Sequence, residues 1–401
     1  MSQSLDETIA ASGVIAARGF RAAGVACGLK KNGALDLALV TSEYDCTCAG
    51  VFTTNRVQAA PVLYDKATLA SNARALRAVV INSGCANACT GDAGLEDART
   101  MASETARALG VQTEQVLVMS TGVIGQRLPM DKIRAGITLA VPRLSPAGGA
   151  DAARAIMTTD TRPKVYALRN AAYTIGGMCK GAGMIHPQMA TMLALVTTDA
   201  QIAPDLLDRA VRVAVNQSFN RISVDGDTST NDTVLVLANG ASGKEIGASD
   251  IEDFTTTLTQ VCVNLAQQIV RDGEGATKFV EIVVSGARTE AEAVRVAKAI
   301  ANSPLVKTAL YGGDANWGRV IAAAGYSGVA VDVATMTLWF GEVNVFARGM
   351  PTDFHEAAST RAIAGSEVSI RLDLGQGTAQ TTVWTCDLSH DYVTINGKYR
   401  T

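Results

Sequence analysis

Residues 175–197 read I-G-G-M-C-K-G-A-G-M-I-H-P-Q-M-A-T-M-L-A-L-V-T, and they join two opposite kinds of segment. Residues 175–182 are dense in glycine, which favours a flexible loop. Residues 191–197 are strongly apolar, which predicts a buried strand. A glycine loop that runs directly into a buried strand is a candidate place for strained backbone or for the close approach of a ligand.

Helices and strands alternate on both sides of this stretch. The hydrophobic periodicity favours a mixed α/β (α+β) class, with one intertwined, layered fold of mixed sheets covered by helices rather than two separate domains. Strands are expected at 35–41, 77–82, 115–120, 233–238, 279–285 and 305–310, and several antiparallel strands at 368–396. Helices are expected at 92–109, 129–141, 151–157, 204–219, 251–270 and 290–301, and residues 320–340 suit a core helix followed by a strand.

The composition excludes several classes of protein. The chain has 401 residues, of which 48% are hydrophobic and 18% charged, so it can bury a sizeable core. The net charge is −3 and no basic run occurs, which speaks against a nucleic-acid partner. Asp6 and Glu7 stand where a signal peptide would be basic, and the window 320–340 is interrupted by glycine and Asp332. A cytoplasmic protein with no membrane partner is therefore expected.

Familiar catalytic templates are absent from the sequence. It contains no Walker phosphate loop, no G-x-S-x-G elbow and no H-E-x-x-H helix. The eight cysteines lack zinc-ligand spacing, so no metal site is expected. A histidine-dependent mechanism would need His186, His355 or His390. We expect His355 at the start of an ordinary helix and His390 in a polar turn, both at the surface.

The segment 225–232, D-G-D-T-S-T-N-D, is rich in carboxylates and hydroxyls. It fails the calcium-loop pattern, because Thr230 occupies the sixth position and Val236 the twelfth. Two interpretations stay open. The segment is either a hydrogen-bonded polar turn or a support behind a functional site.

Thr191 also has two interpretations when it is considered without any relative. A β-branched residue at the start of a strand is ordinary. Alternatively, its hydroxyl attacks the carbonyl of Ala190, and hydrolysis of the resulting ester exposes Thr191 as a new N-terminus. A threonine beside its own α-amine is an activated nucleophile that needs no histidine, because an α-amine titrates near about 7.7–8.0.

Seven ordered blocks give the chain a specific resemblance. They are K-G-A-G-M with M-A-T-M-L (180–193), S-T-G-V-I-G-Q-R-L-P-M (120–130), T-T-D (158–160), D-G-D-T-S-T-N-D-T (225–233), R-D-G-E-G-A-T-K (271–278), N-S-P-L-V-K-T-A with D-A-N-W-G-R (302–319) and Y-V-T-I-N-G-K-Y-R-T (392–401). The set resembles the ornithine acetyltransferase family, also called bifunctional glutamate N-acetyltransferases. The resemblance runs from about residue 18 to the last residue.

This resemblance implies a precursor that cleaves itself between Ala190 and Thr191. The products would be an α chain (1–190) and a β chain (191–401) in one fold, assembled as an (αβ)2 heterotetramer. The implied reaction of arginine biosynthesis is a ping-pong transfer of acetyl from N-acetylornithine to glutamate through an acetyl-Thr191 intermediate. It needs no cofactor, and acetyl-CoA is an alternative donor in bifunctional members.

The resemblance also implies roles for individual residues. Thr191 would be the nucleophile, and Thr121 with Gly122 would form the oxyanion hole. Taken alone, Thr-Gly after a strand indicates a turn, and Lys180 a solvated loop residue. The family's substrate contacts map onto Thr158, Lys180, Thr191, Glu274, Asn396 and Thr401.

Two positions depart from the family pattern. Gln188 stands where asparagine or serine is common, and His186 occupies a variable position.

Two rival functions remain. The first rival is a self-processing aminopeptidase or amidohydrolase with an N-terminal nucleophile, which would hydrolyse without an acceptor. The second is a non-catalytic amino-acid-binding protein, which would stay uncleaved at 41.6 kDa.

Overall fold

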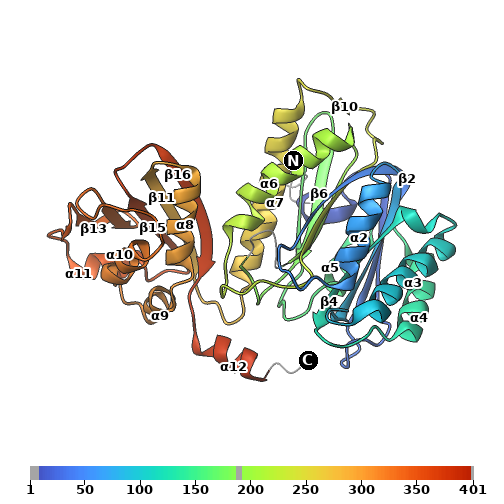
Figure 1. Ribbon diagram of the computed structural model, residues 1–401, viewed down its shortest axis with the longest axis horizontal. Helices are drawn as coiled ribbons and strands as arrows, with labels where there is room; N and C mark the ends of the chain where they lie inside the picture. Colours follow the sequence, from blue (N-terminus) through green and yellow to red (C-terminus); the bar gives the residue numbers. More distant parts are fainter. Residues whose placement is uncertain (1–8, 187–191, 399–401) are drawn as a thin grey trace.

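The computed structural model describes residues 9–186 and 192–398, and these residues form two lobes (Figure 1). The larger lobe contains an eight-stranded sheet and the smaller lobe a six-stranded sheet within the described residues. Both sheets mix parallel with antiparallel pairs and carry helices. The predicted mixed α/β class with helix-covered mixed sheets is therefore confirmed.

The larger lobe has the strand order β4-β3-β2-β9-β7-β6-β5, with β1 paired to β2 beside this path. Its strands are β1 (Phe20–Val25), β2 (Leu37–Phe52), β3 (Leu76–Cys85), β4 (Val116–Val123), β5 (Lys164–Arg169), β6 (Thr174–Lys180), β7 (Leu193–Thr198) and β9 (Thr233–Ala238), with β8 (Gln201–Ile202) and β10 (Glu245–Ile246) as a separate pair. Its helices are α2 (Ala60–Ser71), α3 (Gly91–Leu109), α4 (Met130–Ala140), α5 (Gly149–Ala155), α6 (Pro204–Gln217) and α7 (Ile251–Arg271).

The long strand β2 pairs with β3 through its first half and with β9 through its second half. The two halves of the sheet face each other across a shared hydrophobic core, since residues from both halves belong to that one core. Alternate residues of a single strand point to its two faces. In β7, Leu193 and Leu195 lie in the core between the sheet halves, whereas Ala194 and Val196 pack toward α6 and α7. Helices α2, α3 and α4 cover the other half. The layers are thus helix, sheet, sheet and helix.

The smaller lobe is continuous in sequence, and its sheet has the order β14-β13-β12-β15-β11-β16. Helix α8 packs on β11 and β16 over one apolar core. The elements are β11 (Phe279–Ala287), α8 (Glu290–Ala301), α9 (Pro304–Gly312), α10 (Trp317–Gly325), β12 (Thr337–Phe340), β13 (Val343–Ala347), β14 (Met350–Pro351), α11 (Glu356–Ala362), β15 (Glu367–Asp373) and β16 (Ala379–Cys386).

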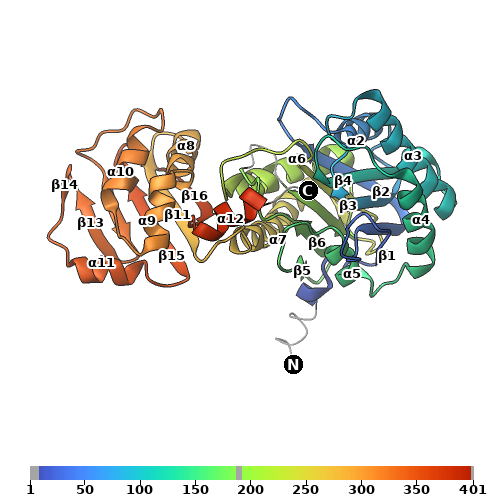
Figure 2. The same cartoon turned by 90° about the horizontal axis from the view of Figure 1, so that it is seen from below.

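The chain then returns from the smaller lobe toward the larger one. Helix α12 (His390–Lys398) lies apart from both sheets, beside the ends of the larger lobe's elements (Figures 1 and 2). The lobes also share direct contacts, since Ile222 forms a β-bridge with Trp384 and Arg221 donates to Thr381 and Glu290. The two lobes are therefore joined by direct contacts.

Several local predictions were wrong. Residues 305–310 form helix α9, because Ser303 accepts a hydrogen bond from the Val306 amide and Pro304 occupies the first turn, both of which begin a helix. The region 368–396 contains only β15 and β16 as strands and ends in α12, and β15 pairs parallel to β11. His390 accordingly begins a helix instead of lying in a polar turn.

A further error concerns the glycine-dense stretch. Residues 174–180 form the fully buried strand β6 and not a loop. Its glycines serve close packing of the chain on itself. A Cβ on Gly176 would stand 2.1 Å from the Gly13 carbonyl oxygen, and one on Gly177 would stand 2.9 Å from Leu265 of α7. Because glycine has no side chain, the backbone at Gly13 and helix α7 can pack closely against this strand.

Candidate active site

A polar pocket of about 150 Å³ lies where β4, β6 and β7 meet in the larger lobe. Six residues that the sequence singled out line it together, although they come from segments far apart in the chain. They are Thr121, Gly122, Thr158, Lys180, Glu274 and Asn396. Ala190, Thr191 and Thr401 lie outside the described residues, but Met192 and Leu193 line the wall directly after the predicted cleavage point.

Thr121 and Gly122 lie near the end of strand β4, where the pairing with β3 shifts register. Gly122 has φ +130°, and a Cβ there would stand 2.3 Å from the carbonyl carbon of Gly84. Only glycine fits this position, so the backbone of β4 bends where it enters the pocket. Such a bend can turn a backbone N–H away from the sheet ladder and toward a ligand.

Asn231 fixes this bend from the loop that precedes β9. Its side-chain amide donates to the carbonyl oxygens of Ala86 at 2.6 Å and Ser120 at 2.8 Å. It therefore ties the ends of β3 and β4 together. Neighbouring Asp232 also lines the pocket.

The segment 225–232 thus satisfies both interpretations that the sequence left open. Asp225 accepts hydrogen bonds from the amides of Met184 at 2.6 Å and Ile185 at 2.8 Å, as in a polar turn that holds a neighbouring loop. Met184 has a positive φ of 57°, which is uncommon for a residue with a side chain. The other end of the segment supports and lines the pocket.

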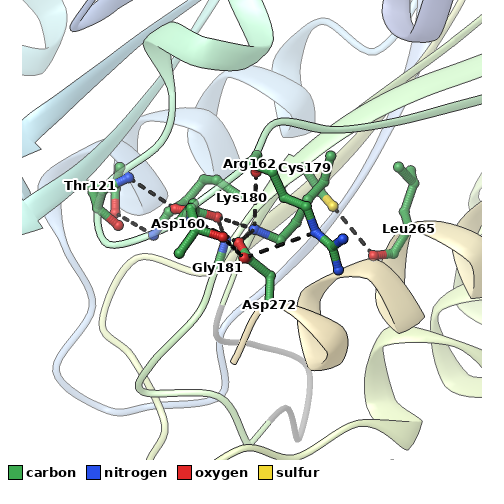
Figure 3. Close-up of polar contacts among 11 residues, drawn as sticks. Thr121, Asp160, Arg162, Cys179, Lys180, Gly181, Leu265 and Asp272 are labelled. Atoms are coloured by element: carbon green, nitrogen blue, oxygen red, sulfur yellow. Dashed lines mark hydrogen bonds and ion pairs between the residues drawn. The ribbon is translucent and has the colours of Figure 1, made fainter. Parts of the chain in front are cut away.

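Lys180 ends strand β6 with its side chain almost wholly buried, in contrast to a solvated loop lysine. Its ammonium donates to the hydroxyl of Thr121 at 3.4 Å (Figure 3). Burial lowers the pKa of Lys180, and the nearby carboxylates of Asp160, Asp232 and Glu274 oppose that shift. A buried cation at a pocket wall suits the carboxylate of an amino-acid substrate.

Glu274 lines the same pocket from the turn after α7. Its carboxylate accepts a hydrogen bond from the Asn396 amide at 2.7 Å, and its backbone N–H donates to the Ala182 carbonyl at 2.9 Å. A Cβ on Gly183 would stand 2.3 Å from that carboxylate, so the glycine makes room for it. Helix α12 therefore brings Asn396 to the site.

Three charged residues behind the pocket were missed by the sequence reasoning: Asp160, Lys164 and Asp272. Asp160 follows Thr158 in the T-T-D block, of which only the threonine was singled out. Lys164 lies in no quoted block, and Asp272 lies in the R-D-G-E-G-A-T-K block, of which only Glu274 was singled out. The two residues are separated by 108 positions, yet their side chains form an ion pair with an N–O distance of 2.5 Å. Figure 3 shows the side chains of Asp160 and Asp272 close to each other, with Gly181 beside them.

The geometry of the described residues points to neither a metal site nor a histidine base. Among residues 9–186 and 192–398, no group of three or more histidine, cysteine or acidic side chains could hold a metal ion. His355 precedes α11 as expected. His186 is half-buried, and its Nδ1 atom lies 3.2 Å from the Asn302 amide nitrogen and 3.2 Å from the Ser223 hydroxyl.

His186 makes the stability of the fold depend on pH. Burial, together with the nearby Lys298 cation, lowers the pKa of His186 from 6.5 to about 4. The unfolded chain therefore binds the proton more readily between these values, so stability is present above pH 6.5 and is lost as the pH falls toward 4. We expect the free energy of unfolding to drop by about 2 kcal/mol between pH 7 and pH 5 through this residue.

Urea unfolding of the His186→Gln variant measures this contribution. Both proteins should carry Thr191→Ala, which prevents the expected self-cleavage, so that each protein unfolds as a single chain. The His186→Gln protein should lose clearly less stability than its parent between pH 7 and pH 5. Equal losses in the two proteins would contradict the assignment.

Comparison with known proteins places the chain in a class. The pocket, with a lysine cation and a glutamate carboxylate in its walls, defines an enzyme site for a small polar molecule. The model of the ArgJ family matches residues 21–401, so the chain belongs to the ArgJ family.

None of the described helices is long and apolar enough to cross a membrane.

Its relatives are similar over their full lengths. The arginine biosynthesis bifunctional protein ArgJ of Symbiobacterium thermophilum is 52% identical over 98% of this chain and 99% of its own. The protein of the same name from Geobacter sulfurreducens is 51% identical over 96% of this chain and 99% of its own. A crystal structure of the Bacillus halodurans protein matches with 44% identity and a TM-score of 0.50, covering 52% of this chain and 100% of the solved chain.

Proposed function

We propose that this protein transfers an acetyl group from N-acetylornithine to glutamate in arginine biosynthesis, through an acetyl ester on Thr191. The observation that carries the proposal is the pocket itself. Thr121, Gly122, Lys180 and Glu274 converge on a wall that continues into Met192, the residue next to Thr191. The relatives named for arginine biosynthesis share about half of the sequence over nearly the whole chain.

The first chemical event is self-cleavage. The Thr191 hydroxyl oxygen attacks the Ala190 carbonyl carbon, the Ala190–Thr191 C–N bond breaks, and the hydroxyl proton passes to the nitrogen, which leaves as the α-amine of Thr191. Water then hydrolyses the ester, leaving a carboxylate on Ala190 and both a hydroxyl and an α-amine on Thr191. The products are residues 1–190 and 191–401. The solved Bacillus chain, which is matched in full yet spans 52% of this one, supports such a division.

The transfer uses the amine that cleavage exposes. The Thr191 hydroxyl attacks the acetyl carbonyl while its own α-amine accepts the proton, and ornithine leaves after taking that proton. Thr121 and the backbone N–H of Gly122, at the bend of β4, would donate hydrogen bonds to the oxyanion. One such donor is worth about 2.7–4 kcal/mol in the transition state. The amine of glutamate then attacks the ester carbonyl, the ester C–O bond breaks, and the proton that the amine loses returns through the α-amine to the Thr191 oxygen.

Substrate recognition follows from the charges of the pocket walls. Lys180 would bind the carboxylate common to both amino acids, and Glu274 would bind the side-chain ammonium of ornithine. Thr158, Asn396 and Thr401 would complete the contacts. The cycle needs no cofactor, with acetyl-CoA as an alternative donor. We further propose an (αβ)2 assembly in the cytoplasm.

Intact mass spectrometry of the wild-type protein tests this function. We expect two chains that divide between Ala190 and Thr191 instead of one chain of 41.6 kDa. Incubation with N-acetylornithine alone should add one acetyl group to the chain that begins at Thr191, and glutamate should remove it. Steady ornithine release without an acceptor would indicate a hydrolase, and a single uncleaved mass without turnover would contradict the proposal.

A further inference from the structure

A chain of buried charges continues from the pocket into the larger lobe. Lys164 of β5 is wholly buried, and its ammonium donates to Asp160 at 2.6 Å and to Asp272 at 2.5 Å. Asp160 and Asp272 are themselves 8% and 6% exposed. Burying three ionised groups is costly unless every charge is paired and hydrogen-bonded, so this cluster places strict demands on its geometry.

The carboxylate of Asp160 holds two separate pieces of the pocket wall. One oxygen accepts the backbone N–H of Thr158 at 2.9 Å. The other accepts the backbone N–H of Gly181, next to Lys180, at 2.7 Å, together with the Lys164 ammonium. A single side chain therefore connects the loop after α5 with the end of β6.

Asp272 secures the far end of the same cluster. Its carboxylate accepts the backbone N–H of Thr161 at 3.0 Å and the Thr161 hydroxyl. It stands at the end of α7, two residues before Glu274. Both carboxylates accept from Lys164, but Asp272 otherwise holds Thr161, whereas Asp160 holds Thr158 and Gly181 of the pocket wall. This difference distinguishes the two roles.

We propose that Asp160, held in place by Lys164, is a positioning residue that aligns Lys180 with Thr158 for a substrate carboxylate by holding the backbone N–H groups of Gly181 and Thr158. This inference deepens the proposed acetyl transfer and rests on it. Asp160 acts through Lys180 and Thr158, which line the pocket in front of it. The consequence is a substrate-binding cation whose position depends on a carboxylate behind the wall.

The electrostatics of the cluster agree with this role. Burial would raise the pKa of Asp160, but Lys180, Lys164 and the hydrogen bond from the Gly181 N–H together outweigh burial and lower it to about 2, so its carboxylate stays ionised near neutral pH. Burial lowers the pKa of Lys180, and Asp160 is the strongest influence that raises it again. The other charged groups that act on this site are Lys164 of β5, Asp232 before β9, Glu274 after α7 and Lys30 after β1.

The Asp160→Asn variant tests the inference through the pH dependence of KM. An amide keeps the shape of the side chain but removes the charge that favours protonated Lys180, so the pKa of Lys180 falls further. Above that pKa the lysine is neutral and cannot pair with a carboxylate. We expect the KM for N-acetylornithine to rise about tenfold more in Asp160→Asn than in wild type between pH 7 and pH 9, with kcat changing less.

Two comparison variants separate positioning from general damage. Asp272→Asn removes the other partner of Lys164 and should cost stability without the added pH dependence of KM. Asp208→Asn breaks an exposed pair with Arg212 and should leave KM and stability unchanged. The inference is overturned if Asp160→Asn follows the wild-type KM profile, or if Asp272→Asn reproduces the Asp160→Asn profile. Absence of acetyl transfer by wild type would instead refute the proposed function.

Discussion

Replacement of Thr191 by alanine should give a single chain of 41.6 kDa that forms no acetyl adduct. The variant lacks the oxygen that would attack both the Ala190 carbonyl and the acetyl group, so processing and transfer fail together. Loss of a nucleophile lowers kcat by on the order of 10⁶-fold when no other group replaces it. Intact mass spectrometry and ornithine release measure the two effects on the same sample.

The matched variant for this prediction is Thr191→Ser, which keeps a hydroxyl and removes only a methyl group. It should still cleave, and the acetyl group should appear on the C-terminal product, whose first residue is then the introduced serine. Thr256→Ala, on the exposed face of α7, should behave like wild type. Cleavage or turnover by Thr191→Ala would remove this residue from both steps.

Elements with local signals could be predicted closely. Strand β9 at 233–238 and helix α8 at 290–301 have the predicted bounds, because an apolar run and a capped amphipathic period are complete within those segments. The segment 305–310 (L-V-K-T-A-L) is too short for its hydrophobic period to distinguish a helix from a strand. Its helix signal was Ser303 with Pro304, which lie just before it.

The glycine-dense stretch shows where local sequence is insufficient. Gly176 and Gly177 are compatible with a loop, but they lie in a buried strand because η1 (Gly13–Ile15) and α7 approach that strand closely. Those partners lie far away in the sequence, one near the N-terminus and the other beyond residue 250. The division of the chain into two lobes, with α12 returning to the pocket, also depends on contacts that no local pattern contains.

The residues of the candidate site also differ in whether they could be predicted from the sequence. Thr121, Gly122, Thr158, Lys180, Glu274 and Asn396 were found because they lie in blocks shared with a family, and the structure brings them together. Lys164 could not be found from sequence, since a single lysine in a strand normally indicates a solvated residue. Its full burial depends on Asp272, which is brought to it by the end of α7.

Lys164→Met should be the most destabilising change in the ion cluster. The substitution leaves the carboxylates of Asp160 and Asp272 buried near each other without the ammonium that both contact. Removing one partner of a buried charge group costs about 3–5 kcal/mol, because the remaining charge keeps its desolvation penalty. Chemical unfolding in the Thr191→Ala background, at pH 7, measures the loss.

The pH dependence and a surface control identify the cause of that loss. In wild type, Lys164 helps to lower the pKa of Asp160, so its removal raises that pKa and protonation at lower pH relieves part of the penalty. The Lys164→Met deficit should therefore be smaller at pH 5 than at pH 7. Lys244→Met removes the cation of a solvent-accessible pair with Asp250 at 2.8 Å and should leave the free energy of unfolding nearly unchanged. Equal costs for the two lysines would show that the buried cluster contributes no more than a surface ion pair, whereas a large cost confined to Lys164 ties the pocket wall to the charges behind it.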